Sequence, residues 1–359
     1  MLYFAKDIDD VQSHIGESHT VRAVGGGTKT NLSRNATISL RAMTGVVDYR
    51  SDEYIISALA GTPLAEVESL LAEKGQSLPF DPLFAKRGAT LGGTVASGLS
   101  GPGRWRYGGL RDFILSVQLV SGAGRIIRGG ANVVKNAAGF DIPKLVGGSL
   151  GCFGILTEVT FKVFPSPKET VTLKLESPDT HSAVEMLCAI AAEPWELMAL
   201  ELSPPSTLWI RLGGQRDAVT KRMNRISATL LQATKTELFT DDDSIWAEAK
   251  ELDWLPEGMS LLKVPVTPRE IVDIEAACNG DSSTFPRRYS CGGNVLYLGY
   301  RDNFVGLMAQ LNTKAGMIVL GNDPRTFIGK SNDNIFGQRL RLVFDPDNKM
   351  SRETYSLGG

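Results

Sequence analysis

The chain is poor in the residues that build metal sites and disulfide frameworks. Its four cysteines, at positions 152, 188, 278 and 291, contain no Cys-x-x-Cys pair, and its only histidines are His14, His19 and His181. Structural zinc and iron–sulfur clusters need grouped ligands, so the sequence predicts no metal site and no cluster. The same spacing argues against a disulfide framework.

Long hydrophobic runs and a strong charge of either sign are also missing. No apolar stretch approaches the ~20 residues that span a bilayer, and residues 1–10 carry charges where a secretory signal would be apolar. The net charge of −2 and the pI near 6.0 give no basic surface for nucleic acid. We therefore expect a cytoplasmic protein with no transmembrane segment, held at the inner membrane, if at all, through partners.

Glycine, by contrast, is abundant. The sequence has 38 glycines, about one and a half times the usual ~7%, and many fall between residues 25 and 154. At roughly 150 residues per domain, the length predicts two or three domains. The proline-punctuated segment 164–167 separates a glycine-rich region from a leaner one. We expect domains at 1–166 and 167–325, with the segment 326–359 packing back on the first.

Local signals in the glycine-rich region predict particular elements. Thr62 and Pro63 are typical of a helix start, and Gly75 is typical of a helix end. Residues 113–120 and 125–128 are typical of a hairpin. From Ile155 onward apolar and polar residues alternate, which predicts a half-buried strand.

The second region shows the order strand–helix–strand–strand–helix twice, over residues 172–231 and 261–320. The second repeat opens its helix with Thr267-Pro-Arg-Glu270, which is a capping box. This βαββαβ order is typical of ferredoxin-like domains. We expect an antiparallel sheet with its helices on one face.

Two familiar nucleotide-binding motifs are incomplete. Gly122-Ala-Gly124 lacks the third glycine of a dinucleotide fingerprint and precedes a predicted strand rather than a helix. Gly329-Lys-Ser331 resembles the end of a phosphate-binding P-loop, but Pro324 stands where that loop requires glycine. Neither a Rossmann site nor a P-loop is predicted.

Three glycine-rich clusters remain. Gly25-Gly-Gly27 follows a short strand, and consecutive glycines let backbone N–H groups turn to one side and bind an anion such as a pyrophosphate. An ordinary glycine turn is the alternative. Thr90 is predicted to cap a short helix of small residues, whose free N–H groups would suit an anionic ligand and whose surface would admit a flat ring. The third cluster comprises residues 135–141 and 147–155.

The order of these motifs is characteristic: GGGTK at 25–29, P-x-D-P at 79–82, ATLGG-x-V-A at 89–96, KNAAGFD at 135–141 and GS-x-G-x-F-G-I-L-x-E at 148–158. It resembles the vanillyl-alcohol-oxidase-type (PCMH-type) FAD-binding domain over about residues 20–165. Residues 61–102 are similar to the FAD-binding E subunits of bacterial glycolate oxidase. The resemblance implies an α+β fold, in which a PCMH-type domain of two α/β subdomains precedes the ferredoxin-like domain as a cap.

The resemblance also implies which residues hold FAD along its pyrophosphate, ribityl chain and ring system: Val24, Gly25, Gly26, Gly27, Thr28, Lys29, Asn31, Pro79, Thr90, Gly92, Gly93, Thr94, Ser97, Gly154, Ile155 and Val159. Covalent members of the superfamily commonly carry a histidine in this loop. None stands there in this chain, so the FAD is expected to be non-covalent. Cys152 stands where the family has threonine; a flavin thioether is one interpretation and a buried small hydrophobe is the other.

By the same resemblance, the chain is the FAD-binding subunit of a glycolate-oxidase-like complex. Such a complex oxidises a small 2-hydroxy acid to a 2-oxo acid with a second flavin subunit and an iron–sulfur subunit. A self-sufficient FAD-dependent alcohol or 2-hydroxy-acid oxidoreductase is one alternative, and a flavin-binding structural subunit without turnover is another.

The sequence does not identify a catalytic base. The second region holds a single histidine, His181, and nothing distinguishes any of its tyrosines Tyr289, Tyr297 and Tyr300. A glycine-rich loop carries three arginines that either present guanidinium groups to a substrate carboxylate or partner, or are simply solvated: Arg104, Arg106 and Arg111. Near the end, Phe344-Asp-Pro346 matches the family's closing segment, but Met350-Ser-Arg352 stands where Asn-Pro-Gly is expected.

Overall fold

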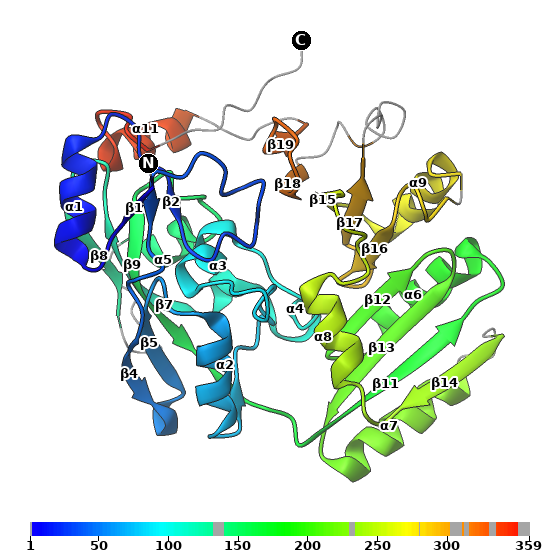
Figure 1. Cartoon of the computed structure of the whole chain (residues 1–359). Helices are drawn as coiled ribbons and strands as arrows, with labels where there is room; N and C mark the ends of the chain where they lie inside the picture. Colours follow the sequence, from blue (N-terminus) through cyan, green and yellow to red (C-terminus); the bar gives the residue numbers. More distant parts are fainter. Residues whose placement is uncertain are drawn as a thin grey trace. The chain divides into compact units, whose positions relative to one another are not determined.

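The computed structural model describes residues 2–131, 140–229, 234–279, 281–301, 311, 316–329 and 335–350. The chain folds into two compact units (Figure 1). The first unit is made of Met1–Gly101, Gly108–Ser166 and Asn332–Thr354. The second unit is made mainly of Pro102–Tyr107 and Pro167–Ser331. The chain therefore enters the second unit at Pro102 and again at Pro167.

A five-stranded antiparallel sheet forms one part of the first unit. Its strands run in the order β4 (Val46–Arg50), β5 (Ile55–Leu59), β9 (Ile155–Lys162), β7 (Ile114–Val120) and β8 (Ile126–Gly130). The hairpin predicted from the sequence is confirmed as β7 and β8. Helix α3 (Leu91–Ser97) contacts β5 and β9, and α5 (Ile142–Val146) contacts β7 and β8.

β9 is buried on both faces, although its alternation predicts a half-buried strand. Thr157 and Thr160 are as deeply buried as their apolar neighbours. Their hydroxyls are satisfied within the sheet: Thr160 Oγ1 lies 2.8 Å from the hydroxyls of Ser57 and Ser116, and Thr157 donates to the Gln118 carbonyl at 3.2 Å. Small hydroxyl side chains that pair with one another can be buried, so alternation did not mean exposure.

The start of helix α2 (Leu64–Ala72) differs from the expected cap. Pro63 is its N-cap, and Thr62 makes no capping bond. The buried Thr62 hydroxyl instead accepts from the Gly45 amide at 3.0 Å, so it ties this loop to the one before β4. After the helix, Gly75 takes a φ of +63°, a conformation that favours glycine, as predicted for the turn that ends it.

A small parallel sheet forms the other part of the first unit, in the order β1 (Tyr3–Phe4), β3 (Ile38–Ser39) and β2 (Ala23–Val24). Helix α1 (Ile8–Glu17) begins at Asp7, whose side chain accepts from the Asp10 amide at 2.9 Å. Four short elements also belong to this unit: the paired strands β6 (Gln76–Ser77) and β10 (Phe164–Pro165), and the 3-10 turns η1 (Ser51–Glu53) and η2 (Leu110–Asp112).

The last described residues pack on the first unit. Helix α11 spans Ile335–Phe344, and the Phe344 ring packs edge-on against Phe153 with centroids 5.4 Å apart. Asp345 is buried and accepts from the Lys349 and Met350 amides at 2.8 and 2.9 Å. Met350 then forms a parallel bridge with Val21, two residues before β2.

Among the described residues, the second unit contains one nine-stranded antiparallel sheet. Its order is β14-β11-β13-β12-β16-β17-β15-β18-β19. The first half has the predicted βαββαβ sequence: β11 (Glu169–Glu176), α6 (Thr180–Ala192), β12 (Ala199–Ser203), β13 (Thr207–Gly214), α7 (Arg216–Thr229) and β14 (Lys235–Phe239).

The second half repeats this order with β15 (Ser260–Pro265), η3 (Pro268–Glu270), α9 (Ile271–Ala277), β16 (Arg287–Ser290), β17 (Val295–Tyr300), β18 (Gly316–Leu320) and β19 (Phe327–Ile328). The capping box is confirmed, because the Thr267 amide and hydroxyl donate to Glu270 at 2.8 and 2.9 Å. The second helix predicted for this repeat, around 304–311, lies outside the described residues except for Leu311. The two halves join where Leu202 pairs with Tyr289.

The sequence predicts that all helices lie on one face of this sheet. This prediction is wrong, because the helices cover both faces. Helices α6, α7 and α9 pack in one large apolar core with residues such as Leu200 and Leu208. Helix α8 (Asp243–Glu251) packs through Trp246 and Ala249 on Ala199. Neighbouring residues of a strand point to opposite faces, so α8 covers the other face. The pattern of two repeats gives no position for a helix between them, which is why α8 was missed.

One buried carboxylate holds α8 to the sheet. Asp242 accepts hydrogen bonds from Thr170 and Thr172 at 2.7 Å and from Arg211 at 2.8 and 3.1 Å, and its side chain is fully buried. Trp246 of α8 donates to the same Thr172 hydroxyl at 2.7 Å. Because Asp242 directly precedes α8, these bonds fix where the helix begins.

We expect Asp242→Asn to lower the free energy of unfolding by about 3 kcal/mol, since it leaves Arg211 partly buried without its main counter-charge. Urea unfolding followed by tryptophan fluorescence measures this. Asp243→Asn is the matched control, because Asp243 meets the same Arg211 at 3.2 Å but is 90% exposed. Its loss should cost less than ~1 kcal/mol. Equal stability of the two variants would show that Asp242 does not anchor α8.

Candidate functional site

The segment Gly25–Thr28 presents a run of unsatisfied backbone donors. It follows β2 and is half-buried. The N–H groups of its four residues make no hydrogen bond to any residue that the structure describes. Two of its carbonyls are occupied, since the Arg41 guanidinium donates to Gly25 O at 3.1 Å and also to Gly26 O. Backbone N–H groups away from bulk water are normally paired, so four in succession suit an anionic ligand.

This segment lies directly against the segment 88–90. A Cβ added at Gly26 would overlap the Gly88 carbonyl oxygen, and one added at Gly25 would overlap the Thr90 hydroxyl. Only glycine lets the two backbones approach this closely. The first and second glycine clusters of the sequence therefore form one structure.

Thr90 caps α3, as predicted: its hydroxyl accepts from the Gly93 amide at 3.3 Å. The expectation of free N–H groups at this helix end is wrong. The Leu91 amide donates to the Thr62 carbonyl at 3.0 Å, and the Gly92 amide donates to the Ala60 carbonyl at 2.8 Å. The backbone after β5 thus takes the donors that an anion would need, which leaves Gly25–Thr28 as the N–H donors of the site.

The far end of α3 holds the third cluster. The amides of Gly148 and Leu150 donate to the carbonyls of Val95 and Ala96, both at 2.8 Å. Gly98 has φ +64°, and a Cβ there would lie 2.8 Å from the Gly148 Cα atom. The turn 147–151 is therefore packed on the helix backbone. The other part of this cluster, Lys135–Gly139, lies outside the described residues.

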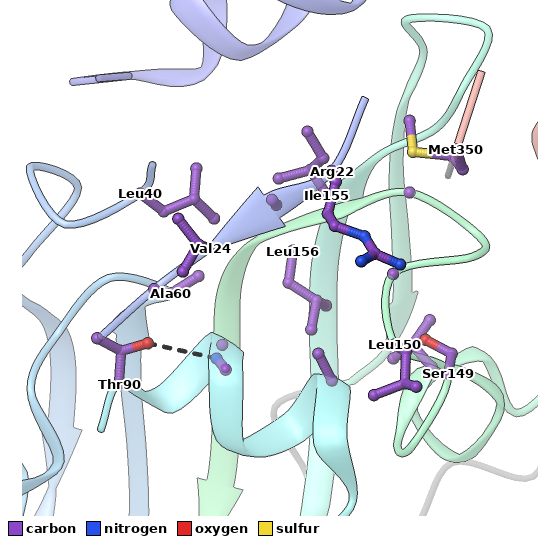
Figure 2. A pocket seen from close by; sticks show the side chains of 18 of the residues that line it. Arg22, Val24, Leu40, Ala60, Thr90, Ser149, Leu150, Ile155, Leu156 and Met350 are labelled. Carbon is purple, nitrogen blue, oxygen red and sulfur yellow. Dashed lines mark hydrogen bonds between the residues drawn. The ribbon is translucent and has the colours of Figure 1, made fainter. Parts of the chain in front are cut away.

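These segments line a cleft within the first unit (Figure 2). Figure 2 shows Thr90 at one side and Ser149, Leu150 and Met350 at the other. Arg22 is the only charged residue among those that line the cleft. Its guanidinium also donates to the Arg34 carbonyl at 2.8 Å. The lining is otherwise aliphatic, glycine or hydroxyl, so it can hold a ligand but offers no acid or base.

The predicted cofactor residues fall into three groups. Seven of them line the cleft: Val24, Gly25, Thr90, Gly92, Gly93, Gly154 and Ile155. Three more, in the loop beside it, are Gly26, Gly27 and Thr28. The remaining six are buried and are not among the residues that line the cleft: Lys29, Asn31, Pro79, Thr94, Ser97 and Val159.

Several lining residues were not predicted. Leu40, Ala60 and Met350 come from parts of the chain without a glycine motif. Ala60 directly precedes Gly61-Thr-Pro, the segment from which the sequence predicts a helix start. Met350 is placed by the bridge to Val21, which no local pattern reveals.

Cys152 lies in the turn 151–153 and does not line the cleft. It is half-buried rather than fully buried, so it is not the enclosed small hydrophobe that one interpretation requires. The neighbours on either side, Gly151 and Gly154, do line the cleft.

The three arginines of the glycine-rich loop belong to different units. Arg104 and Arg106 lie on α4 (Arg104–Tyr107) in the second unit, where Arg106 forms an ion pair with Glu196 at 3.2 Å. Arg111 belongs to the first unit and donates through Nε to the Gly147 carbonyl at 2.8 Å. Arg111 therefore supports the turn of the third glycine cluster.

The three tyrosines of the second unit are poor candidates for a base. Tyr289 donates to Glu275 at 2.7 Å and Tyr300 donates to Asp323 at 2.8 Å. Burial raises the pKa of Tyr289, Tyr297 and Tyr300, so each holds its proton more tightly than a free tyrosine. His181 is exposed and lies 3.2 Å from Glu185 on the same helix.

Comparison with known proteins agrees with this geometry. Residues 1–130 match the family model described as FAD binding domain. The first unit therefore has the fold of a PCMH-type FAD-binding domain. Over 97–98% of its length the chain has the fold of a carbohydrate oxidase from Microdochium nivale (TM-score 0.74, 15% identity, 90% of that chain) and of an alkyldihydroxyacetonephosphate synthase (TM-score 0.70, 17% identity, 76% of that chain).

Two curated relatives match part of the chain. Glycolate oxidase subunit GlcE of Escherichia coli is 37% identical over 219 residues, which are 59% of this chain and 61% of that protein. A D-lactate dehydrogenase of Anaerostipes hadrus is 32% identical over 147 residues, which are 41% of this chain and 30% of that protein. The matched segment thus spans less than two thirds of either relative. No helix in the described parts of the chain is long and apolar enough to cross a bilayer.

The residues present fit FAD. The unpaired N–H groups of Gly25–Thr28 and the Arg22 charge suit its pyrophosphate. The Thr94 hydroxyl is buried on α3 and has no hydrogen-bond partner in the part of the chain described. A buried hydroxyl without a partner costs free energy, and Thr94 would recover it if a bound polar group reached it past the neighbouring Gly93 of the lining.

Gly26→Ala should reduce retained FAD by tenfold or more, because its Cβ would push the donor segment away from Gly88. The ratio of flavin to protein absorbance after gel filtration measures this. Gly16→Ala is the control, since a Cβ there meets no atom within 4 Å. Normal FAD content in Gly26→Ala would mean that this segment does not hold the cofactor.

Thr94→Val should stabilise the flavin-free protein by about 1 kcal/mol, because it removes an unpaired buried hydroxyl at constant shape. It should also weaken FAD binding. Thermal melts with and without added FAD measure both effects. Thr157→Val is the control, since that buried hydroxyl is paired and its loss should destabilise the protein. A Thr94→Val protein that is less stable without FAD would contradict the assignment.

Proposed function

We propose that the chain holds FAD without a covalent bond and serves as the flavin-binding subunit of an enzyme that oxidises a small 2-hydroxy acid to a 2-oxo acid. The observation that carries the FAD part is the run of free N–H groups at Gly25–Thr28 beside a cleft whose one charge is Arg22. The substrate class rests on the relatives, which are named as a glycolate oxidase subunit, D-lactate dehydrogenases and D-2-hydroxyglutarate dehydrogenases.

The bound FAD would supply the two-electron acceptor for the oxidation. In this proposal the chain positions the cofactor through Val24, Gly25–Thr28, Thr90, Gly92, Gly93, Gly154 and Ile155. Lys29, Asn31, Pro79, Thr94, Ser97 and Val159, which do not line the cleft, support those residues. The absence of a charged group other than Arg22 from the lining assigns substrate recognition to residues outside the cleft. The first unit is the FAD domain, and residues 167–325 form the cap.

We further propose that the chain works with a second flavin subunit and an iron–sulfur subunit, in the cytoplasm. The names of two relatives support a multi-subunit enzyme: subunit GlcE, and subunit GlcD of Bacillus subtilis, which is 25% identical over 240 residues. The four cysteines of this chain are too scattered to ligate an iron–sulfur cluster, so such a relay would come from a partner. Arg106 and its neighbours on α4 are candidates for substrate or partner contact.

The D-lactate dehydrogenase relatives support a second candidate, a single-chain FAD-dependent dehydrogenase of a 2-hydroxy acid. Because the two candidates share cofactor and substrate class, they differ only in whether the purified chain turns over alone.

The test begins with the purified full chain. Acid precipitation should release FAD into the supernatant, and a yellow pellet would instead show a covalent flavin. Glycolate and D-lactate are then added anaerobically, with and without the co-expressed partner subunits, and bleaching of the flavin absorption is followed. We expect fast bleaching only with partners. Turnover of the single chain near ~10 s⁻¹, typical of competent enzymes, would favour the second candidate. A chain that retains no flavin would overturn both.

A further inference from the structure

A row of polar side chains crosses the centre of the second unit's sheet. The pairing register places Lys263 of β15 opposite Tyr297 of β17, and Tyr297 opposite Arg288 of β16. The residues on either side of Lys263, Leu262 and Val264, belong to the large apolar core. Alternation along the strand therefore puts Lys263 on the face away from that core. Tyr297 and Arg288 share this face for the same reason.

On one side of Tyr297, the charged residue of this row has a counter-charge. Arg288 lies 2.5 Å from Glu201 of β12, and both side chains are nearly buried. The Ser290 hydroxyl donates to the other Glu201 oxygen at 2.7 Å. Glu201 is thereby paired with Arg288, although its charge also contributes to the raised pKa of Tyr297 and of Cys291. It is not available to the lysine on the other side of Tyr297.

On the other side of Tyr297, Lys263 has no counter-charge among the described residues. Lys263 is partly buried and has no carboxylate within ion-pair distance among the residues that the structure describes. The described neighbours that act on it electrostatically are Arg104 and the Cys291 thiol. Burial raises the pKa of Cys291 and of Tyr297, so both are neutral near pH 7. Across the other strand edge it faces Met317 of β18, which carries no charge.

Arg104 is brought to this face by the way α4 is anchored. Trp105 packs so closely on the turn after β16 that a Cβ added at Gly292 would overlap its ring. Arg106 is tied to Glu196 at 3.2 Å. These two contacts hold the helix turn that carries Arg104, and Arg104 influences Lys263, Cys291 and Tyr297 together.

Lys263 and Arg104 therefore act on each other electrostatically, and neither forms an ion pair with a carboxylate in the described part of the chain. Burial, with a contribution from Arg104, lowers the pKa of Lys263 to about 8. Such an arrangement is unfavourable in the empty protein and is relieved when an anion enters. A carboxylate is the anion that lysine and arginine together hold with charge-assisted hydrogen bonds.

We propose that Lys263 and Arg104 bind the carboxylate of the 2-hydroxy acid, on the face of the sheet that carries Tyr297 and Arg288. This inference rests on the proposed function for the identity of the anion, and it names the residues that select an acid over a neutral alcohol. Neither residue has a sequence motif. Arg104 was a weak candidate among three arginines, and Lys263 was not a candidate at all.

The site has a pH dependence of known sign. Below pH 8 Lys263 is protonated and attracts the carboxylate, so affinity is constant there. Above pH 8 the free site loses that proton, and affinity falls by up to tenfold per pH unit. The bound carboxylate raises the pKa of Lys263, so binding near pH 8 takes up protons from the buffer.

The test uses oxamate, an isostere of the 2-oxo acid that cannot be oxidised at a hydroxyl carbon, and titrates it calorimetrically into the full chain. Lys263→Met should weaken oxamate binding about tenfold or more at pH 7 and remove the pH dependence. Lys263→Arg should keep the affinity and also lose the fall above pH 8. Lys174→Met is the matched control, because Lys174 lies on β11 of the same sheet but is paired with Glu176 and Glu237.

Lactamide, the neutral amide of lactate, separates carboxylate recognition from general affinity for the sheet and should not bind. Equal oxamate affinity in wild type and Lys263→Met would overturn the inference, as would lactamide binding as tightly as oxamate. The titration is performed whether or not the chain retains FAD. Loss of FAD binding therefore counts against the proposed function alone, and unchanged oxamate binding counts against this site alone. Melting curves at pH 7 confirm folding, and Lys263→Met should melt no lower than wild type because it removes a disfavoured cation.

Discussion

The first unit depends on the close approach of two backbones, Gly25–Gly26 and Gly88–Thr90. A side chain on either glycine would separate them. Their contact places the unpaired N–H groups beside the capped end of α3, and it aligns β2 with the helix that forms the floor of the cleft. Two further parts of the cleft are connected to this contact through α3. The turn 147–151 is hydrogen-bonded to the carbonyls of Val95 and Ala96 on α3. The loop after β5 is hydrogen-bonded to the amides of Leu91 and Gly92.

This contact could be predicted from the sequence, because glycine permits the close approach of two backbones by its lack of a side chain. Where a residue's role depended on distant partners, the sequence was silent or misleading. Thr62 is typical of a helix cap but serves Gly45, and the amides of Leu91 and Gly92 are occupied by carbonyls from the loop after β5. Thr160 is polar in an alternating strand, yet hydroxyls from two neighbouring strands allow its burial. Such pairings become visible only when strand order is known.

The second unit shows the same division at the scale of a domain. Repetition of βαββαβ could be predicted, because each half carries its own periodicity and caps. The joining of the halves at Leu202 and Tyr289 could not, and neither could α8, which lies between the repeats. The joined sheet has one face covered by a continuous apolar core and another on which charged groups from four strands meet. Lys263 looks like an ordinary surface lysine until Tyr297 and Arg288 are placed beside it.

The bridge between Val21 and Met350 has a consequence for how the protein is made. Met350 lines the cleft, but it is translated only after the whole second unit. Domains fold as units during synthesis, at about 5–20 residues per second. The sheet of the first unit is therefore synthesised early, before the lining residue Met350 exists. The second unit must emerge and collapse before α11 can return. Closure of the cleft is thus a late event in the folding of this chain.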